Sequence, residues 1–496
     1  MSPFASYLWE FSWRNALFSC ACIELTFYAY YRWHLLPRAQ IFAQPSQPYR
    51  DYPCPVEDRV KLLQRICHRL ERQAIHEPHH DFRKRFSDFM LAWFRPTATD
   101  VTAVPGLRAA SFNSTSSSAE ASSDEESYED DRINKSKRWS IAGLKKAEAD
   151  DFFAWAFFGK DTNALEPSER LGLQKIYSEL ARDYGLIFEP GRGGLLEGRR
   201  LTLDPVRSMH RPLLSYAIIH GLERIGNVVL RLHGFERHTA KTGLVYWHRN
   251  GLEPEKRLPL LFFHGIAPAG KTFYLPLCLL GLGDRQRNMY LFENRGISSS
   301  YLTFDVLSDD ATVSGVEEAL HVHGDHARPI SLCGHSFGSC PMTWLLYSSL
   351  RDNIQQFILI DPVTILLSEP DVMINFLYAR LDDSTKAVNS HLAGIRLVGS
   401  ELFTEYYLRR NFAWYNSELW LEDIPKSVQI LVCLSEKDQI LSAPNVKREI
   451  ESLGSKEIDL VYWEGVDHAD CITNPRTWPQ LRELMLAQET SLLKKD

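Results

Sequence analysis

The chain has 496 residues, of which 44% are hydrophobic and 24% charged, a balance typical of globular domains that excludes a wholly disordered, collagenous or multi-span membrane chain. Its net charge is −7, from 56 Lys and Arg against 63 Asp and Glu, and no long basic run offers phosphates a footprint, so we expect no nucleic-acid partner. The nine cysteines show no CxxC pairing, which predicts reduced thiols.

The first forty residues differ from the rest. Residues 15–31 carry one charge, Glu24, and are flanked by Trp13 and Trp33. As a helix this run would reach about 26 Å, slightly short of a hydrocarbon core of about 30 Å, and an ionised Glu inside it would cost a few kcal/mol. We predict an uncleaved membrane anchor at 1–40. A spanning helix, an in-plane interfacial helix and a buried docking helix all remain open.

Basic residues follow this segment more than they precede it, with Arg32 and Arg38 after it and Arg14 before it. The positive-inside rule then predicts a membrane-associated protein whose catalytic domain faces the cytosol. The sequons at Asn113 and Asn134 should in that case carry no glycan.

The next two hundred residues or so divide by composition. Residues 41–110 include apolar positions at the three-and-four spacing of an amphipathic helix and are assigned to a helical extension. Residues 111–138 are Ser-rich, acidic and almost without apolar side chains, which predicts a disordered linker. Apolar runs at 151–158 and 212–219 predict buried or membrane-facing helices in a lead-in region at 139–242.

From residue 243 the pattern changes to short β-branched or aromatic runs separated by helical stretches. The runs begin at Gly243, Leu258, Asn288, Ile330, Phe357, Gln429 and Ile458. Near-continuous apolar strands of this kind predict an α/β domain at 243–496 with a mostly parallel sheet and helices on both faces. Residues 364–426 show no strand pattern, are rich in aromatic residues and predict a helical cap. In such sheets the chemistry lies at the carboxyl ends of the strands.

One strand end carries a nucleophile pattern. Gly334-His335-Ser336-Phe337-Gly338 follows an apolar strand and precedes a helix predicted to start near Pro341. A G-x-S-x-G sequence places the serine on a tight turn, where the two glycines remove Cβ atoms that would collide with neighbouring backbone. The pattern therefore predicts that Ser336 is exposed to a cleft.

Two further strand ends supply an acid and a base. Asp438 follows the strand that begins at Gln429, and His468 follows the last strand. A serine hydroxyl needs such a base because it is scarcely nucleophilic at neutral pH. Asp438 is the favoured acid, while Glu436 and Asp361 remain alternatives.

The strand that begins at Leu258 ends in His264-Gly265-Ile266. At that turn the N–H of Ile266 can join the N–H of Phe337 in an oxyanion hole.

The chain order Ser336, Asp438, His468 makes the region from Gly243 to the C-terminus resemble the α/β-hydrolase superfamily, whose members share nucleophile elbow, acid and histidine in this order. Residues 292–298 also resemble the D-x-R-G-x-G-x-S turn of that family, although two positions depart from it.

The resemblance implies acyl chemistry without a cofactor. Ser336 would attack a carbonyl, His468 would take and return the proton, and Asp438 would orient the imidazole. It further implies that His264 and His335 shape the site rather than act as the base, and that the cap sets specificity.

Two histidine clusters raise the alternative of a metal. Residues 76–80 match H-E-x-x-H, but Pro78 interferes with the helix that this motif needs. His321, His323, Asp325 and His326 match an H-x-H-x-D-H pattern, yet they follow a predicted helix instead of a buried strand. We expect no metal at either place.

These observations together predict a membrane-associated serine hydrolase that cleaves a lipophilic carboxylic ester or a lipid. An acyltransferase with the same triad, a catalytically silent scaffold and a metal-dependent hydrolase are the alternatives.

Overall fold

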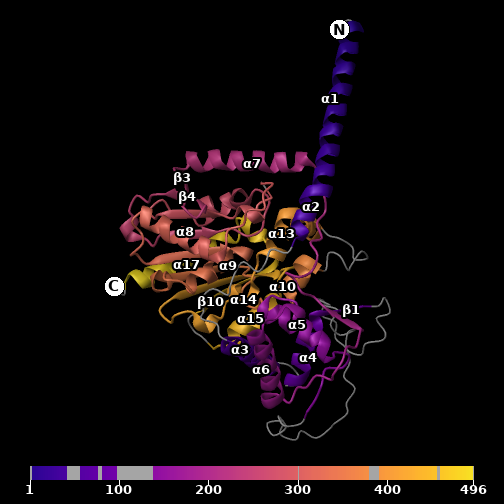
Figure 1. The fold of residues 1–496 in the computed structure, drawn as a ribbon. Helices are drawn as coiled ribbons and strands as arrows, with labels where there is room; N and C mark the ends of the chain where they lie inside the picture. Colours follow the sequence, from indigo (N-terminus) through magenta and orange to yellow (C-terminus); the bar gives the residue numbers. More distant parts are fainter. Residues whose placement is uncertain are drawn as a thin grey trace. The chain divides into compact units, whose positions relative to one another are not determined.

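The structure is a computed structural model that describes residues 3–41, 56–75, 81–97, 138–299, 301–378, 390–454 and 458–494 (Figure 1). The chain forms two compact units. Unit 1 consists of Met1–Gln47, Pro205–Leu367 and Asp371–Asp496, and unit 2 of Pro48–Asp204 with Ser368–Pro370. The predicted linker up to residue 137, both sequons and the H-E-x-x-H residues lie outside the described ranges.

Unit 2 is mainly helical. Its helices are α3 (Val56–Ile75), α4 (Phe82–Ala92), α5 (Lys146–Phe158) and α6 (Pro167–Asp183), and a short antiparallel pair joins β1 (Phe94–Pro96) to β2 (Leu196–Gly198). The predicted apolar stripe of α3 is buried, including Cys67 and Leu70, and α3 packs on α4 and α6.

Unit 1 is built on an eight-stranded sheet. The strands are β3 (Glu236–Thr239), β4 (Val245–Arg249), β5 (Leu260–Phe263), β6 (Met289–Glu293), β7 (Ile330–His335), β8 (Ile354–Ile360), β9 (Gln429–Lys437) and β10 (Ile458–Asp467), in the order β10-β9-β8-β7-β5-β6-β4-β3. All neighbours from β10 to β6 are parallel, and β4 and β3 are antiparallel additions. The mostly parallel sheet is thus confirmed. The sequence missed β3 because its residues, Glu-Arg-His-Thr, form no apolar run.

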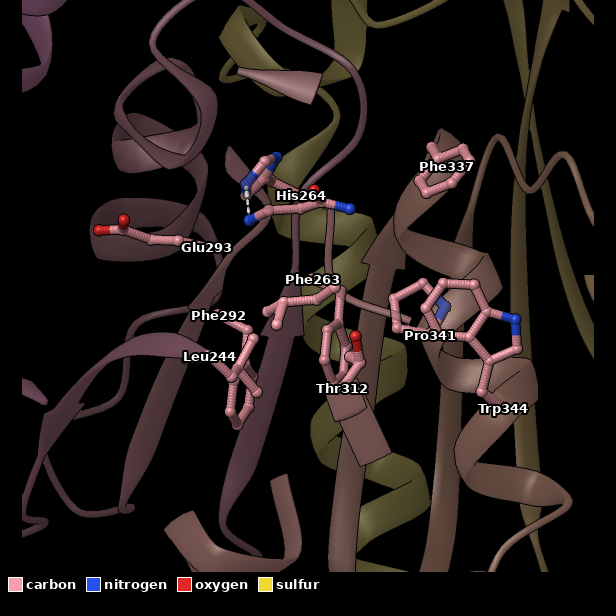
Figure 2. Close-up of a pocket in the computed structure, with 11 residues that line it drawn as sticks. Leu244, Phe263, His264, Phe292, Glu293, Thr312, Phe337, Pro341 and Trp344 are labelled. Atoms are coloured by element: carbon pink, nitrogen blue, oxygen red, sulfur yellow. Dashed lines mark hydrogen bonds between the residues drawn. The ribbon is translucent and has the colours of Figure 1, made fainter. Parts of the chain in front are cut away.

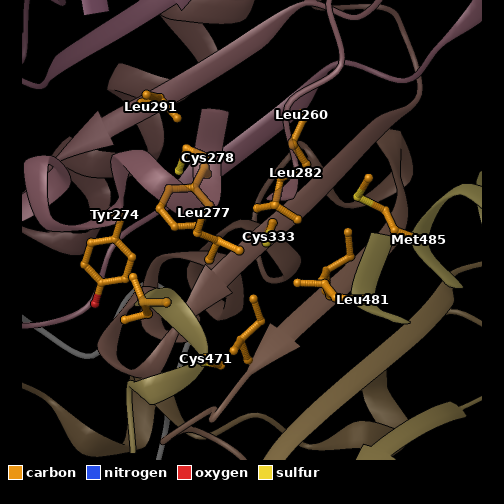
Figure 3. Close-up of a cluster of buried hydrophobic side chains, with 14 of the residues drawn as sticks. Leu260, Tyr274, Leu277, Cys278, Leu282, Leu291, Cys333, Cys471, Leu481 and Met485 are labelled. Atoms are coloured by element: carbon orange, nitrogen blue, oxygen red, sulfur yellow. The ribbon is translucent and has the colours of Figure 1, made fainter. Parts of the chain in front are cut away.

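Alternate residues of these strands supply a core on one face of the sheet. Figure 3 shows Leu260, Leu291 and Cys333 in one cluster with Leu481 and Met485. The last two come from α17 (Trp478–Leu493), and the turn Leu277–Gly281 covers the same face. Further helices are α8 (Asp309–Val322) and α9 (Ser339–Leu346), the latter packed on β5, β7 and β8.

The segment between β8 and β9 contains no strand among its described residues. It forms α10 (Asp371–Met373), η11 (Ile374–Tyr378), α12 (Ser390–Gly399), α13 (Leu402–Arg410), α14 (Trp414–Ser417) and η12 (Leu421–Asp423), and β9 is followed by α15 (Ala443–Ser452). The rings of Tyr407 and Phe412 lie 5.6 and 5.7 Å from that of Phe337, beside Ser336. This segment therefore contacts the turn at 334–338 that carries Ser336, the nucleophile turn.

The N-terminal segment forms α1 (Pro3–Tyr30), η1 (Tyr31–Leu35) and α2 (Leu36–Gln40). Its C-terminal half is packed, because Phe27, Tyr31 and Leu35 form a small cluster with Tyr216 of α7 (Leu213–Leu232). In the described part of the chain, no helix combines the length and the apolar character needed to cross a bilayer. The spanning form of the predicted anchor is therefore not supported, because Glu24 and several Asn, Ser, Thr and Tyr residues interrupt the apolar run of α1.

Candidate active site

The nucleophile turn lies where the sheet order reverses. From β5 the chain passes to β6 on one side, whereas β7 pairs with β5 on the other, so the connections after β5 and β7 diverge at the carboxyl edge. Ser336 follows β7 directly and adopts a left-handed conformation, with φ of +52°. A non-glycine residue rarely adopts this conformation unless the surroundings impose it.

The two glycines of the motif permit this turn. A Cβ atom at Gly334 would lie 2.6 Å from the Gly338 carbonyl oxygen, and one at Gly338 would lie 2.1 Å from the Phe263 carbonyl oxygen. Both contacts are with backbone, which cannot rotate away. The predicted reason for the G-x-S-x-G spacing therefore matches the packing here.

Gly338→Ala is expected to destabilise the protein by about 3 kcal/mol, because the added methyl overlaps the β5 backbone. Thermal unfolding would measure this against Gly394→Ala, where a Cβ meets nothing within 4 Å and lies in a helix. A Gly338→Ala variant as stable as the Gly394→Ala variant would contradict this account of the turn.

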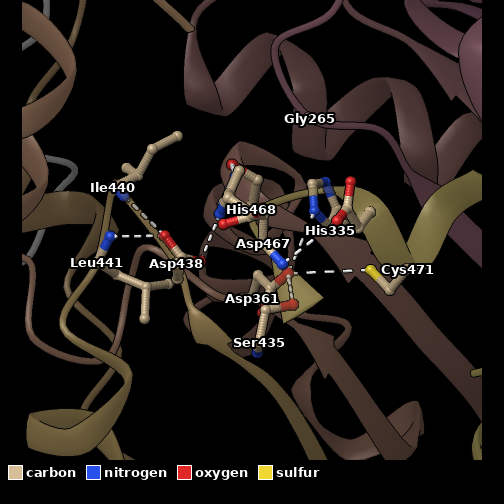
Figure 4. A network of polar contacts seen from close by, with 12 residues as sticks. Gly265, His335, Asp361, Ser435, Asp438, Ile440, Leu441, Asp467, His468 and Cys471 are labelled. Atoms are coloured by element: carbon tan, nitrogen blue, oxygen red, sulfur yellow. Dashed lines mark hydrogen bonds and ion pairs between the residues drawn. The ribbon is translucent and has the colours of Figure 1, made fainter. Parts of the chain in front are cut away.

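The structure brings Ser336, His468 and Asp438 into one hydrogen-bonded chain. His468 Nε2 lies 3.0 Å from Ser336 Oγ, and His468 Nδ1 lies 2.5 Å from Asp438 Oδ2. Figure 4 shows His468 between Asp438 and the network around Asp361. The three side chains come from the ends of β7, β9 and β10, as the sequence predicted.

The acid nearest the histidine is Asp438. Its second oxygen accepts hydrogen bonds from the backbone N–H groups of Ile440 and Leu441, at 2.7 and 3.0 Å, which fix the carboxylate. Of the alternatives, Glu436 is exposed and accepts a bond from the N–H of Gly465. Glu436 is therefore not part of the hydrogen-bonded chain of Ser336, His468 and Asp438.

Asp361, the other alternative, is fully buried and serves different partners. Its oxygens accept bonds from the Ser435 N–H and hydroxyl, at 2.7 and 2.8 Å, and lie 3.8 Å from Nε2 of His335 (Figure 4). Asp361 thus connects the end of β8 to Ser435 of β9 and makes no hydrogen bond to His468.

The two motif histidines have local structural partners. His264 Nδ1 donates to the Gly265 carbonyl, and its Nε2 accepts from the Asn294 N–H. His335 Nδ1 is 3.0 Å from the Tyr274 hydroxyl. Burial lowers the pKa of each histidine to about 4, so both are neutral near pH 7. Neither hydrogen-bonds to Ser336.

Sequence reasoning missed Tyr274. Its buried hydroxyl accepts the N–H of Gly265, at 3.0 Å, and contacts His335, so it links the two predicted turns. The turn at Gly265 passes so close to the nucleophile that a Cβ there would lie 3.0 Å from the Ser336 Cβ. No motif could have revealed this tyrosine, which is one aromatic residue among several.

The two predicted oxyanion residues lie on these turns. Phe337 begins the turn into α9, where N–H groups have no partner inside the helix, and Ile266 follows Gly265 and is half-buried. Ile266 and Phe337 each directly follow one of two residues that approach each other closely, Gly265 and Ser336.

An apolar pocket adjoins this site. Together with the solvent at its mouth it measures about 400 Å³, and its walls include Phe263, Phe292, Phe337 and Trp344, with His264 at one end (Figure 2). One polar wall residue, Glu293, is paired with Lys271 at 2.6 Å and with the Trp247 N–H at 2.7 Å. Its charge is therefore compensated within the protein, which leaves the pocket suited to an apolar group.

Three histidines outside this site could supply metal ligands. His238 of β3, His248 of β4 and His323 at the end of α8 have nitrogens within 4.8 Å of one another. Burial, and then the neighbouring His323 and His238, lower the pKa of His248 to about 3. The rings of His248 and His323 stack 3.6 Å apart, however, so their nitrogens lie side by side instead of converging on one ion.

The residues of the H-x-H-x-D-H pattern at 321–326, which the sequence raised only as an alternative, have separate partners. Asp325 is buried and accepts bonds from Asn288, Tyr290 and Arg328. His321 stacks on His326 instead. The sequence pattern thus reflects local packing at the end of α8.

Comparison with known proteins finds no matching family model and no matching curated protein. Solved structures similar to part of the chain include a bacterial membrane phospholipase A described as a virulence factor, at a TM-score of 0.40 and 14% identity over 55% of this chain and 92% of its own. Carboxylesterase CesB of Bacillus subtilis has a TM-score of 0.40 and 14% identity over 55% of this chain and 98% of its own. An esterase of Thermogutta terrifontis has a TM-score of 0.36 and 14% identity over 51% and 99%. Likeness at this level carries no argument about activity, which has to come from the site itself.

Proposed function

We propose that this chain, whose sheet and nucleophile turn have the α/β-hydrolase arrangement, is a serine hydrolase that cleaves a lipophilic carboxylic ester. The observation that carries the proposal is the continuous chain from Ser336 Oγ through both nitrogens of His468 to Asp438, at 3.0 and 2.5 Å. A nucleophile, a base and an orienting acid at hydrogen-bond distance are what acyl transfer requires.

The geometry supports an acyl-enzyme route. Ser336 Oγ attacks the ester carbonyl carbon while its proton passes to His468 Nε2, and Asp438 stabilises the resulting imidazolium through Nδ1–H. The N–H groups of Ile266 and Phe337 hold the oxyanion. His468 then returns the proton to the departing alkoxide, and a water molecule repeats the sequence to release the acid.

The lipophilic substrate is supported by the surroundings of Ser336. The adjoining pocket is lined mainly by apolar side chains, and the ring of Phe337 is covered by Tyr407 and Phe412. Such a lining favours an acyl chain over a charged substrate.

We also propose that the protein associates with a membrane and that its catalytic domain faces the cytosol. In a eukaryotic host, Asn113 and Asn134 should then carry no glycan.

Activity towards a neutral ester is expected to fall on the acid side with a midpoint above the ordinary histidine value of about 6.5. Burial by itself lowers the pKa of His468, but Asp438 and then Asp361 raise it, and the net direction is upward. Activity needs the neutral imidazole, so it is present above this pKa and lost as the pH falls through it. The measurement is kcat/KM across the pH range, and a midpoint well below 6.5 would contradict the assignment of His468.

The direct test uses the purified chain, a fluorophosphonate probe and aryl esters of short and long acyl chains. The expected result is covalent labelling and a preference for the longer chains. A well-folded protein that is neither labelled nor active would refute the proposed function and favour a silent scaffold.

A further inference from the structure

The helix α7 has an apolar face that none of the described residues of unit 1 covers. The face consists of Leu214, Ile218, Leu222, Ile225, Val228 and Leu232, which recur at intervals of three and four residues and are 49–78% exposed. The opposite side of α7 buries Tyr216, Glu223 and Leu230. A helix of a globular domain normally turns its apolar stripe inwards, so this outer stripe marks a docking surface.

A second uncovered apolar surface begins at the same place. From Asn15 to Ile23 every side chain of α1 that the structure describes is exposed, with Leu17 at 65% and Phe18 at 71%. Packing provides most of the stability of helices in proteins, so a helix this exposed needs another environment to cover it. α1 meets α7 at the N-terminal end of α7 (Figure 1).

Glu24 joins the two helices. Its carboxylate accepts the N–H of Leu213 at 2.8 Å and that of Leu214 at 3.0 Å, and so caps the first turn of α7. The one acidic residue of the predicted anchor run is therefore used within the protein, and the exposed part of α1 extends from this junction.

The charges around the face favour one kind of occupant. The exposed charged residues of α7 are Arg224 and Arg231, whereas its one acid, Glu223, lies on the buried side. Apolar stripes flanked by arginines are typical of helices that lie on anionic lipid. The acyl-chain region of a bilayer is continuous, so it can cover the outer face of α7 and the exposed part of α1 together. A single groove on a partner protein would cover only one of the two helices.

The buried side of α7 leads to the site. Glu223 lies 3.7 Å from Lys271, and Gly226 approaches Thr272 so closely that a Cβ would lie 2.4 Å from its hydroxyl. Both partners belong to Gly270–Tyr274, the turn whose Tyr274 holds the Gly265 N–H. The exposed apolar face of α7 and its contacts with Gly270–Tyr274 thus lie on opposite sides of one helix.

We propose that the outer face of α7, together with the exposed part of α1, is a lipid-docking surface that seats the carboxyl edge of the sheet on an anionic phospholipid bilayer. The ester substrate then reaches Ser336 from that bilayer. The substrate part of this inference rests on the proposed function, whereas the docking part does not.

The test is flotation of the full chain with vesicles of phosphatidylcholine, with and without phosphatidylserine. The double variant Ile218→Glu/Ile225→Glu is expected to lower vesicle partitioning at least about tenfold, because two apolar side chains leave the lipid. Arg224→Ala/Arg231→Ala is expected to remove much of the gain from phosphatidylserine. The matched control is Leu252→Glu, a side chain 78% exposed in the turn after β4, which should bind vesicles as the unaltered chain does.

Unchanged partitioning of the Ile218→Glu/Ile225→Glu variant, checked for folding by circular dichroism, would overturn the inference. Self-association that this variant abolishes, without vesicle binding by the unaltered chain, would also overturn it in favour of a second copy on α7. Hydrolysis of a water-soluble ester by the unaltered chain tests the proposed function separately. Vesicle binding without ester hydrolysis would support the docking surface and contradict the proposed function. Ester hydrolysis without vesicle binding would support the proposed function and contradict the docking surface.

Discussion

Ser336→Ala is expected to lower kcat for ester hydrolysis by at least about 10³-fold and to abolish fluorophosphonate labelling. The reason is that the variant lacks the hydroxyl oxygen that lies 3.0 Å from His468 Nε2 and would form the acyl-enzyme. Oxyanion stabilisation and substrate binding would leave a small residual rate.

The matched control is Ser349→Ala, an exposed serine beyond the end of α9 in the same unit. It should keep both labelling and turnover. Labelling that persists in Ser336→Ala would show that the probe reacts elsewhere, and it would remove the basis for the proposed mechanism.

Asp438→Asn is expected to lower kcat by about 10³–10⁴-fold while leaving the fold intact. An amide at this position can present its N–H₂ group to His468 and so favour the wrong tautomer, with Nε2 protonated and unable to accept the Ser336 proton. The KM for a soluble ester should change little, because Asp438 touches the base and not the substrate.

Asp361→Asn is the informative comparison, because Asp361 was the other acid compatible with the sequence. Its carboxylate bonds to Ser435 and not to His468, so its loss should cost no more than about tenfold in kcat. It should instead lower the Tm, because a fully buried carboxylate loses part of its hydrogen bonding. A larger loss of kcat in Asp361→Asn than in Asp438→Asn would reverse the assignment of the acid.

The helix α7 contacts a segment that supports the candidate site. α7 rests on Gly270–Tyr274 through the Glu223–Lys271 pair, and Lys271 also neutralises Glu293 in the wall of the pocket. Both ion pairs are almost fully buried, so removing one partner would leave an uncompensated charge. The surface proposed to dock on lipid is therefore packed against the same residues that shape the site.

The sheet and the tight turn at Ser336 could be predicted from the sequence. Short apolar runs rich in β-branched and aromatic residues, separated by helical stretches, predicted buried strands, and the two glycines around Ser336 predicted a turn that side chains would block. The order of the strand ends also predicted that His468 lies near Ser336, because the carboxyl ends of parallel strands meet at one edge. The strand pattern and the G-x-S-x-G motif are local or periodic, so they can be recognised without knowing which distant segments are in contact.

Other placements depend on contacts between distant segments of the chain. Asp438 and Asp361 both follow buried strands, and the distance to His468 separates them. Glu24 was unexplained in an apolar run until the fold placed it at the first turn of α7. The apolar stripe of α7 likewise gave no sign of which side would be buried. Such roles depend on which segments meet in space, and a pattern confined to one segment carries no information about its neighbours.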